Sequence, residues 1–232
     1  MIKLGKVFIG CPVRNRGWIL PHYLEALKGL DYNHKKIEYC FIVNNSTDDT
    51  LDILQNFCHR TSSPVKIVSH DLPGNNKCRR GYYNLAHLAI LRNILLNEFL
   101  KSNADYLFSV DSDIILPSHA LRALQETDCD IVSALVCNGH EIGDTSFYNI
   151  LNRRLDGRYE YVRNFPAEEI FEVDCTGAAY LIKREVIEKH QVRYSAAYGS
   201  EDIGFCKEAK AKGLRICCNP GVRARHEMIE GG

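Results

Sequence analysis

The sequence carries no excess charge of either sign. Its 232 residues include 29 Lys and Arg and 29 Asp and Glu, so the formal net charge is zero. Without a net charge there is no overall field to attract nucleic acid or an anionic membrane surface. We therefore expect neither as a partner.

The sequence also lacks long hydrophobic runs. A helix needs about 18 consecutive apolar residues to cross a bilayer. The nearest stretch, residues 84–100, is interrupted by His87, Arg92 and Glu98 among others. The N-terminus enters an apolar run at once, without the longer apolar region and small-residue cleavage site of a signal peptide. These absences predict a cytoplasmic protein with no transmembrane segment.

No Cys-X-X-Cys pair occurs among the ten cysteines. This absence argues against a structural zinc site. The cysteines are scattered, and Cys11, Cys40 and Cys137 lie in apolar runs. Because no export signal accompanies them, we interpret them as buried free thiols in a reducing compartment rather than as a disulfide framework.

What the sequence does contain is an alternation of strand and helix patterns. Aromatic residues make up 9% and hydrophobic residues 45%, as in an ordinary globular protein. The length suits one large domain or two small ones and is enough for a real core. Strands that alternate with helices form βαβ units, so the expected fold class is α/β with a largely parallel sheet. The predicted strands are 6–11, 37–43, 65–69 and 130–136, and the predicted helices are 18–30, 51–57 (capped by Ser46 or Thr47), 84–100 and 119–126.

One predicted strand ends in two carboxylates. Residues 105–117 have the pattern of a buried central strand, whose apolar run stops at Asp111 and Asp113 and then resumes. Open α/β sheets bind ligands at strand ends beside a topological switch point. Two hard oxygen ligands there suit Mg²⁺ or Mn²⁺, and such an ion suits a diphosphate. An isolated Asp-X-Asp is also common in solvated loops, so the rest of the chain has to decide.

Three other loops offer polar groups of the kind that bind nucleotides. Two arginines follow the first strand, two asparagines follow the second, and a basic loop precedes the long helix. Each set is open to two interpretations, a solvated surface or a contact with base, ribose or diphosphate. These residues are Arg14, Arg16, Asn44, Asn45 and, in the loop 71–83, Lys77, Arg79 and Arg80.

The second half of the chain changes character. Residues 138–165 are polar and aromatic and contain a hairpin-turn signal at 155–158, so we interpret them as an antiparallel excursion over a cleft. Three small residues at 177–179 follow. They either let a ligand approach the backbone or allow strand and helix to pack closely.

Acidic residues also open the last predicted helix, which runs to about residue 212. Ser200 is a plausible N-cap, and Glu201 and Asp202 occupy the first turn. Helix-start chemistry alone could account for both acids. A last strand is predicted at 214–218, before the segment that ends at His226.

In this order and spacing, the segments resemble the GT-A glycosyltransferases of the family 2 type. Residues 91–96 and 110–114 also look like those of the fungal mannan-polymerase mannosyltransferases. The resemblance covers nearly the whole chain. It implies a single GT-A catalytic domain over residues 1–232, with a nucleotide-binding half at 1–117 and an acceptor-side half at 118–232. The implied fold is a Rossmann-like, mostly parallel sheet flanked by helices.

The resemblance also implies roles for individual residues. It places a nucleotide-sugar donor and a Mn²⁺ or Mg²⁺ cofactor in the cleft, with Asp202 as the general base and Glu201 orienting the sugar or acceptor. Many family members carry an acidic residue where Asn44-Asn45 stand, so base recognition departs from the pattern. The implied nucleotide-sugar contacts are Pro12, Arg14, Asn44, Asp48, Arg92, Asp111, Ser112, Asp113 and Gly177, and the implied metal ligands are Asp111, Asp113 and His226.

The expected reaction moves a sugar from a UDP- or GDP-sugar to an acceptor hydroxyl on a glycan, lipid or protein. A carboxylate that serves only as base makes the displacement single, so the anomeric centre inverts. One alternative is a nucleotidyltransferase that makes sugar nucleotides, but its glycine-rich phosphate loop is missing because residues 13–17 contain one glycine. The other alternative is a non-catalytic sugar-binding domain on the same fold. The joint presence of Asp111, Asp113, Asp202 and His226 argues against it.

Overall fold

The computed structural model describes residues 4–73, 84–138 and 147–227. Of the predicted basic loop, residues 74–83, with Lys77, Arg79 and Arg80, lie outside the described residues. The helices are α1 (Leu20–Lys28), the 3-10 helix η1 (His34–Lys36), α2 (Thr50–Arg60), α3 (Leu85–Lys101), α4 (Ala120–Gln125), α5 (Arg184–Glu188) and α6 (Glu201–Ala211). The strands are β1 (Val7–Val13), β2 (Ile37–Val43), β3 (Val65–Ser69), β4 (Tyr106–Val110), β5 (Ile114–Ile115), β6 (Ile131–Val136), β7 (Ile150–Arg153), β8 (Tyr159–Tyr161), β9 (Phe171–Glu172), β10 (Cys175–Thr176), β11 (Ala179–Lys183) and β12 (Ile216–His226).

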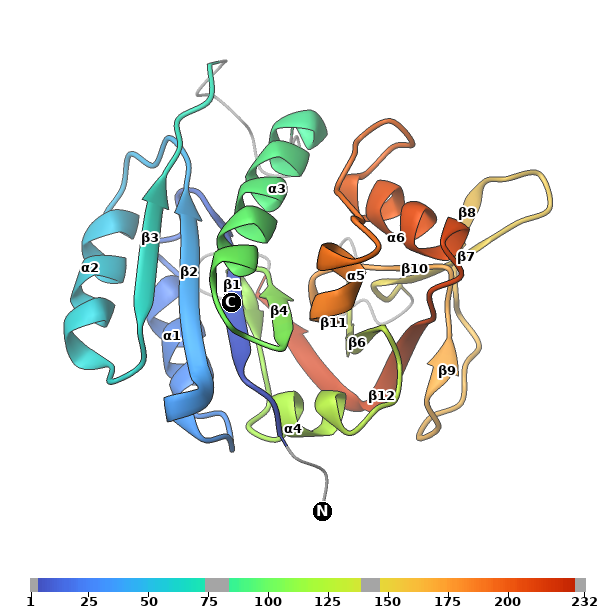
Figure 1. Ribbon diagram of the computed structural model, residues 1–232, viewed down its shortest axis with the longest axis horizontal. Helices are drawn as coiled ribbons and strands as arrows, with labels where there is room; N and C mark the ends of the chain where they lie inside the picture. The colour runs from blue at the N-terminus through green and yellow to red at the C-terminus, as the bar shows by residue number, and fades with distance from the viewer. Residues whose placement is uncertain (1–3, 74–83, 139–146, 228–232) are drawn as a thin grey trace.

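The predicted α/β class is confirmed. The main sheet has the order β3-β2-β1-β4-β11-β6-β12-β5, and its first four strands are all parallel (Figure 1). Strand β11 runs antiparallel between β4 and β6, and β12 returns parallel to β6. Helices cover both faces of this sheet, which explains why β2 is an almost continuous apolar run.

The helices create a separate core on each face of the sheet. Helices α1, α2 and α4 pack over one face, where Tyr23 and Leu54 are fully buried. Helices α3, α5 and α6 pack over the other, where Leu95 and Phe205 are buried. Pro21 lies in the first turn of α1, as expected, because an N–H has no helical partner there.

The topological switch point lies between β1 and β4. From β1 the chain proceeds outward to β2 and β3, and then crosses back through α3 to β4 on the other side (Figure 1). The carboxyl ends of β1 and β4 therefore border the crevice in which open α/β sheets bind ligands. The loops that carry Arg14 and Asp111 start at these two ends.

The last strand is longer than the sequence indicates. The sequence predicts a strand at 214–218 only, with Pro220-Gly221 after it. The structure continues β12 through a bulge, where its pairing with β6 shifts between Asn219 and Arg223. Proline is tolerated at a bulge because it needs no ladder partner there. The extension then pairs antiparallel with β5, so His226 lies opposite Ile114.

A second, three-stranded sheet of order β10-β7-β8 confirms the predicted antiparallel excursion. Strands β7 and β8 form the expected hairpin, and Gly157 in its turn has φ +85°. Leu151 pairs with Tyr161 on one side and Cys175 on the other, so these three residues form a row across the sheet. Leu155, at the tip, is fully exposed.

The predicted cap of α2 is wrong. The N-cap residue is Asp49, which makes no side-chain cap hydrogen bond. The carboxylate of Asp48 instead accepts a hydrogen bond from the backbone N–H of Thr50 (3.1 Å). Ser46, one of the two proposed caps, accepts from the backbone N–H of Asn15 (3.2 Å). The Ser- and Thr-containing loop therefore ties β1 to β2 rather than capping the helix.

The interpretation of the cysteines as free thiols is wrong for one pair. Cys129 and Cys217 form a disulfide, with their Cα atoms 6.3 Å apart. This separation lies within the usual span of a disulfide. The two residues are 88 positions apart in sequence and meet only because β6 and β12 are neighbours. The other cysteines in the described part of the chain are free.

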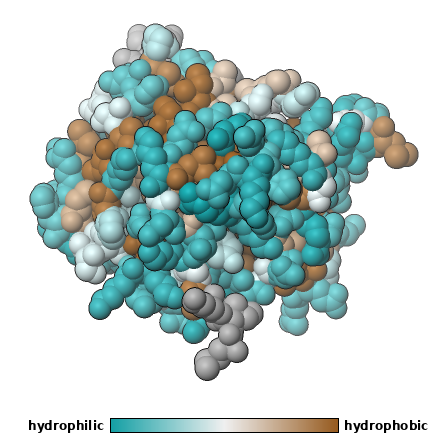
Figure 2. Space-filling model, viewed as in Figure 1, coloured by the Kyte–Doolittle hydropathy of each residue, from teal (hydrophilic) through white to brown (hydrophobic). Residues whose placement is uncertain are grey.

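Within the described ranges, none of the helices combines the length and apolar character needed to cross a membrane. Figure 2 shows that this face of the molecule is mainly hydrophilic, with apolar residues gathered over α3 and the neighbouring strands β2 and β3. Among the exposed large hydrophobic residues, Ile90 on α3 is 44% exposed.

Candidate active site

A cavity of about 900 Å³ opens at the carboxyl ends of β1, β2 and β4. Its walls come from both halves of the chain, because the start of α6 and the end of β12 close the side opposite β1, β2 and β4. Of the residues that the family resemblance implies for the site, all but Asp48 line it. These are Pro12, Arg14, Asn44, Arg92, Asp111, Ser112, Asp113, Gly177, Glu201, Asp202 and His226.

Asp113 and His226 meet in this cavity although 113 positions separate them in sequence. The Nε2 atom of His226 lies 3.7 Å from Oδ1 of Asp113. Backbone pairing fixes this approach, since β12 pairs with β5 directly after Asp113 and the N–H of Glu227 donates to the Asp113 carbonyl (2.9 Å). The bulge in β12 is therefore what carries the histidine to the carboxylate.

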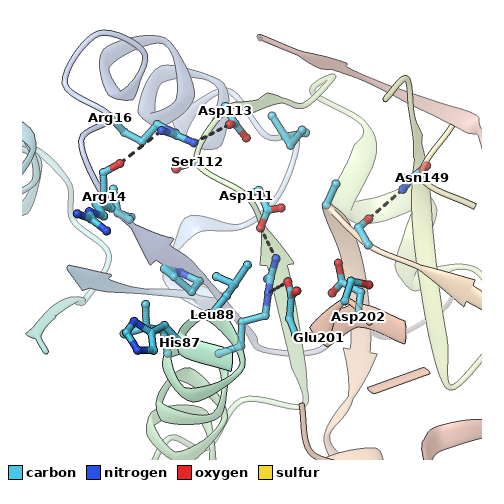
Figure 3. A pocket seen from close by; sticks show the side chains of 18 of the residues that line it. Arg14, Arg16, His87, Leu88, Asp111, Ser112, Asp113, Asn149, Glu201 and Asp202 are labelled. Carbon is cyan, nitrogen blue, oxygen red and sulfur yellow. Dashed lines mark hydrogen bonds and ion pairs between the residues drawn. The ribbon is translucent and has the colours of Figure 1, made fainter. Parts of the chain in front are cut away.

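Arg16 contacts the other oxygen of the same carboxylate. Its Nη2 atom donates to Asp113 Oδ2 at 3.2 Å (Figure 3). Burial by itself would raise the pKa of Asp113, but the contact with His226 and the charge of Arg16 outweigh it and lower the pKa. Asp113 is therefore a carboxylate at neutral pH, 11% exposed and bordered by two basic side chains.

A buried arginine organises the floor of the cavity. The Arg92 guanidinium donates through Nη2 to Asp111 (2.8 Å), through Nη1 to Ser109 (3.1 Å) and through Nε to Glu201 (3.1 Å). Burial alone would lower the pKa of Arg92, but the surrounding carboxylates raise it well above its ordinary value, so the guanidinium stays charged. Arg92 thus holds the end of β4 against the start of α6.

This arrangement gives three of the predicted site residues a defined environment. Arg92, expected near the diphosphate or sugar, bonds protein groups with all three of its nitrogens. Asp111 bonds Arg92, and its burial and the nearby Asp113 and Glu201 carboxylates raise its pKa in spite of that cation. Glu201 is 4% exposed at its side chain and bonds Arg92 as well.

Asp202 is the carboxyl that Arg92 does not contact directly. Ser200 caps α6 as predicted, by accepting from the Ile203 N–H (3.3 Å), and this places Asp202 in the first turn. Burial is the largest influence on Asp202; with the repulsion of Glu201 and Asp111, it raises the pKa to about 7 despite Arg92 and a hydrogen bond from Tyr180. A single guanidinium facing three carboxyl groups thus leaves Asp202 poised to exchange a proton near neutral pH.

The small-residue segment at 177–179 fits closely around Asp202. A Cβ atom on Gly177 would lie 2.3 Å from Oδ2 of Asp202, closer than any real contact. The next residue, Ala178, has φ +64°, and its carbonyl accepts from the N–H of Asp111 (2.8 Å). Asn149 fixes the segment by donating to the Gly177 carbonyl (2.9 Å; Figure 3). Of the two interpretations of this segment, close packing against the Asp202 side chain explains the glycine.

One end of the cavity is formed by the loops after β1 and β2. Pro12, Arg14 and Asn44 line it, and Asn44 donates to the backbone carbonyl of His70 (2.9 Å). Asp48 lies behind this wall. Its carboxylate accepts from the backbone N–H of Gly17 (2.9 Å) and so holds the loop after β1 in place rather than reaching the cavity.

The donor set at Asp113 fits a divalent cation in part. Among the described residues, no group of three His, Cys, Asp or Glu side chains gathers closely enough to hold a metal. Asp113 and His226 nevertheless offer one ionised carboxylate and one imidazole side by side, a pair suited to Mn²⁺. Asp111, proposed as the third ligand, is engaged by Arg92.

The sequence analysis did not identify three residues that contact the candidate site residues. They are Arg16, Tyr180 and Asn149. Arg16 was named only as one of two arginines after the first strand, and nothing in the sequence identified it as the partner of Asp113. Tyr180 and Asn149 gave no signal, because a tyrosine in an apolar run and an asparagine in a polar segment are both common. Their partners, Asp202 and Gly177, lie 22 and 28 positions away in sequence.

Comparison with known proteins begins with a family model described as Anp1, which matches residues 3–156. A Glycosyltransferase 25 family member of Drosophila melanogaster is 24% identical over 181 residues, covering 74% of this chain and 29% of the relative. The corresponding protein of Drosophila pseudoobscura pseudoobscura is 24% identical over 184 residues, covering 74% and 28%. The chain spans under a third of the length of the curated relatives that it matches.

Solved structures share the fold at low sequence identity. GalNAc-T7, solved with UDP, GalNAc and Mn²⁺, has a TM-score of 0.70 at 17% identity, covering 99% of this chain and 45% of its own. The mannosyltransferase PcManGT of Pyrobaculum calidifontis, solved with GDP-Man and Mn²⁺, has a TM-score of 0.62 at 18% identity, covering 99% and 59%. TarS of S. aureus, solved with UDP-GlcNAc, has a TM-score of 0.62 at 17% identity, covering 97% and 60%. The expected GT-A glycosyltransferase fold is therefore confirmed.

Proposed function

Because the chain belongs to the Anp1 family and has a GT-A glycosyltransferase fold, we propose that it moves a sugar from a UDP- or GDP-sugar to an acceptor hydroxyl. One observation carries this proposal. A carboxylate beside an imidazole, Asp113 with His226, shares a cavity with a half-buried carboxyl of raised pKa, Asp202. A diphosphate leaving group and a proton-accepting base need these two different environments.

The donor occupies the side of the cavity formed by residues 1–117. Pro12, Arg14 and Asn44 surround the nucleoside, and the diphosphate extends toward Asp113 and His226. Asp113 and His226 would hold a Mn²⁺ or Mg²⁺ ion there, and the ion would supply Lewis-acid stabilisation of the charge that develops on the diphosphate. Support comes from the two neighbouring structures that hold a nucleotide or nucleotide-sugar together with Mn²⁺.

Asp202 removes the proton from the acceptor hydroxyl. A lone pair of the hydroxyl oxygen forms the new bond to the anomeric carbon, and the O–H bonding pair stays on that oxygen as its proton passes to Asp202. The bond from the anomeric carbon to the diphosphate breaks and leaves its electrons on the diphosphate. Because no protein atom attacks the sugar, the displacement is single and the configuration inverts. The pKa of about 7 suits this step, since a general base works best when its pKa lies near the working pH.

The acceptor enters from the side of residues 118–232. Leu151 and Tyr161, paired across the β7–β8 hairpin, line the cavity on that side, as do Ile203 and Asp202. Tyr161 is 39% exposed and packs edge-to-face on Phe147. The hydroxyl is carried by a glycan, a lipid-linked molecule or a protein, and a cytoplasmic location stays a prediction.

A panel of UDP- and GDP-sugars, incubated with Mn²⁺ and assayed for released UDP or GDP, tests this function. We expect one donor to be turned over, with release abolished by a chelator and reduced at least 100-fold in Asp113→Ala. Configuration is then read by NMR of the transferred product. A product of retained configuration would reject Asp202 as a simple base, and full activity of Asp113→Ala would reject the metal site. Pyrophosphate release from a nucleoside triphosphate and a sugar phosphate would indicate a nucleotidyltransferase.

A further inference from the structure

Two buried tyrosines stand behind the proposed base. Tyr180 is fully buried at the centre of the sheet, where β11 pairs with β4 on one side and β6 on the other. Its hydroxyl donates to Oδ1 of Asp202 at 2.9 Å and also contacts the hydroxyl of Tyr194. A tyrosine hydroxyl has one proton. If Tyr180 gives it to Asp202, Tyr194 must donate to Tyr180.

Tyr194 is held rigidly in turn. The side chain of Asn93 on α3 makes two hydrogen bonds to the Tyr194 backbone, to its carbonyl (2.9 Å) and from its N–H (3.0 Å). The Tyr194 ring stacks on Phe205 with centroids 4.4 Å apart, and the Arg92 guanidinium lies 5.6 Å from the ring centre. The Tyr194–Tyr180 pair therefore has a fixed geometry set by the sheet and two helices.

The two oxygens of Asp202 are consequently not equivalent. Tyr180 bonds Oδ1, whereas within the described residues no hydrogen bond reaches Oδ2, the oxygen to which Gly177 comes close. We propose that Tyr180, supported by Tyr194, is a positioning residue: it fixes Asp202 through Oδ1 and leaves Oδ2 to take the acceptor's proton. This inference rests on the proposed function in that it deepens the role of Asp202.

A hydrogen bond to the ionised form of a carboxyl favours that form. Tyr180 therefore lowers the pKa of Asp202 and offsets part of the effect of burial. It keeps the base ionised, and so active, at lower pH than burial alone would allow. The titratable and charged groups around this carboxyl are Arg92 on α3, Asp111 after β4, Cys175 on β10, Tyr180 on β11, Tyr194 before α6 and Glu201 on α6.

Tyr180→Phe removes the hydroxyl and keeps the ring. We expect the pKa of Asp202, followed by ¹³C NMR of labelled aspartate, to rise by about one unit. The acidic limb of the kcat profile for UDP or GDP release should move by the same amount. Well below that limb kcat should fall about tenfold, and at high pH it should change little. Tyr194→Phe removes a hydroxyl that contacts Tyr180 rather than Asp202, so it should produce a smaller shift.

Tyr39→Phe is the matched control, because Tyr39 is an equally buried tyrosine on β2 and its hydroxyl has no partner among the described residues. It should leave both titrations unchanged. The positioning role is overturned if the pKa of Asp202 is unchanged in Tyr180→Phe. It is also overturned if that pKa shifts by as much in Tyr39→Phe. An NMR titration that moves while the kcat profile does not supports the Tyr180 contact and instead overturns Asp202 as the base.

Discussion

At the scale of single residues, one guanidinium determines how the acidic groups of the cavity behave. Arg92 bonds Asp111 and Glu201 directly and leaves Asp202 with a raised pKa. The sequence identifies these four positions, since each stands out at a strand end, in mid-helix or at a helix start. It does not reveal that they are partners, because the contacts span up to 109 positions and arise only in the folded chain.

Asp202 should make stability depend on pH. Its pKa rises from the ordinary 3.8 to about 7 on folding, so between about pH 4 and pH 7 the folded protein holds a proton that the unfolded chain has released. Stability therefore falls as pH rises through this window, by up to about 1.4 kcal/mol per unit. Asp202→Asn cannot titrate and should lose this slope.

Urea unfolding of both proteins across this pH range measures the effect. The free energy of unfolding of the wild type should decline relative to that of Asp202→Asn as pH rises. Parallel curves would mean that Asp202 is ionised at its ordinary pKa in the folded state.

Gly177 should be needed for the position of Asp202. In Gly177→Ala the new Cβ would lie 2.3 Å from Oδ2, and the carboxylate must move away. A displacement of about 1 Å at a reacting group can lower the rate about 100-fold, so we expect kcat to fall about 10- to 100-fold. Gly29→Ala is the matched control, because its Cβ would come no closer than 3.4 Å to another atom. Equal activity of both variants would contradict the close fit.

At the scale of elements, the sequence predicts best what depends on local pattern. Strands β2 and β3 have the predicted bounds because each is a short apolar run closed by polar residues. The continuation of β12 past Pro220 was missed because it depends on a bulge and on a partner strand, β5, of only two residues. The Cys129–Cys217 disulfide was missed for a similar reason, since its partners meet through strand order.

Asn93 joins α3 to the segment before α6. Asn93→Ala removes two hydrogen bonds to the Tyr194 backbone, and we expect a loss of about 2 kcal/mol in the free energy of unfolding. Asn97→Ala, at an exposed position on the same helix, should change stability by less than about 0.5 kcal/mol. Denaturant unfolding compares the two. If they are equally stable, the contact with Tyr194 contributes nothing to holding α3 against this segment.

At the scale of the whole molecule, the fold brings two distant parts of the chain to one cavity. The GT-A fold could be predicted from the order of the motifs along the chain. Each motif alone is common, but the whole set in this order is specific. The separate environments of Asp113 and Asp202 could not be predicted from the sequence, because they depend on which charged groups share the cavity. Arg16 and His226 adjoin the first, and Arg92, Glu201 and Tyr180 adjoin the second.

The binding of Mn²⁺ in the presence of UDP or GDP, measured by calorimetry, tests this division most directly. Asp113→Ala and His226→Ala should each weaken Mn²⁺ binding at least tenfold, whereas Asp202→Asn should bind Mn²⁺ as the wild type does and yet fail to transfer sugar. Mn²⁺ binding that is unchanged in Asp113→Ala and His226→Ala, or that is lost in Asp202→Asn, would contradict the account.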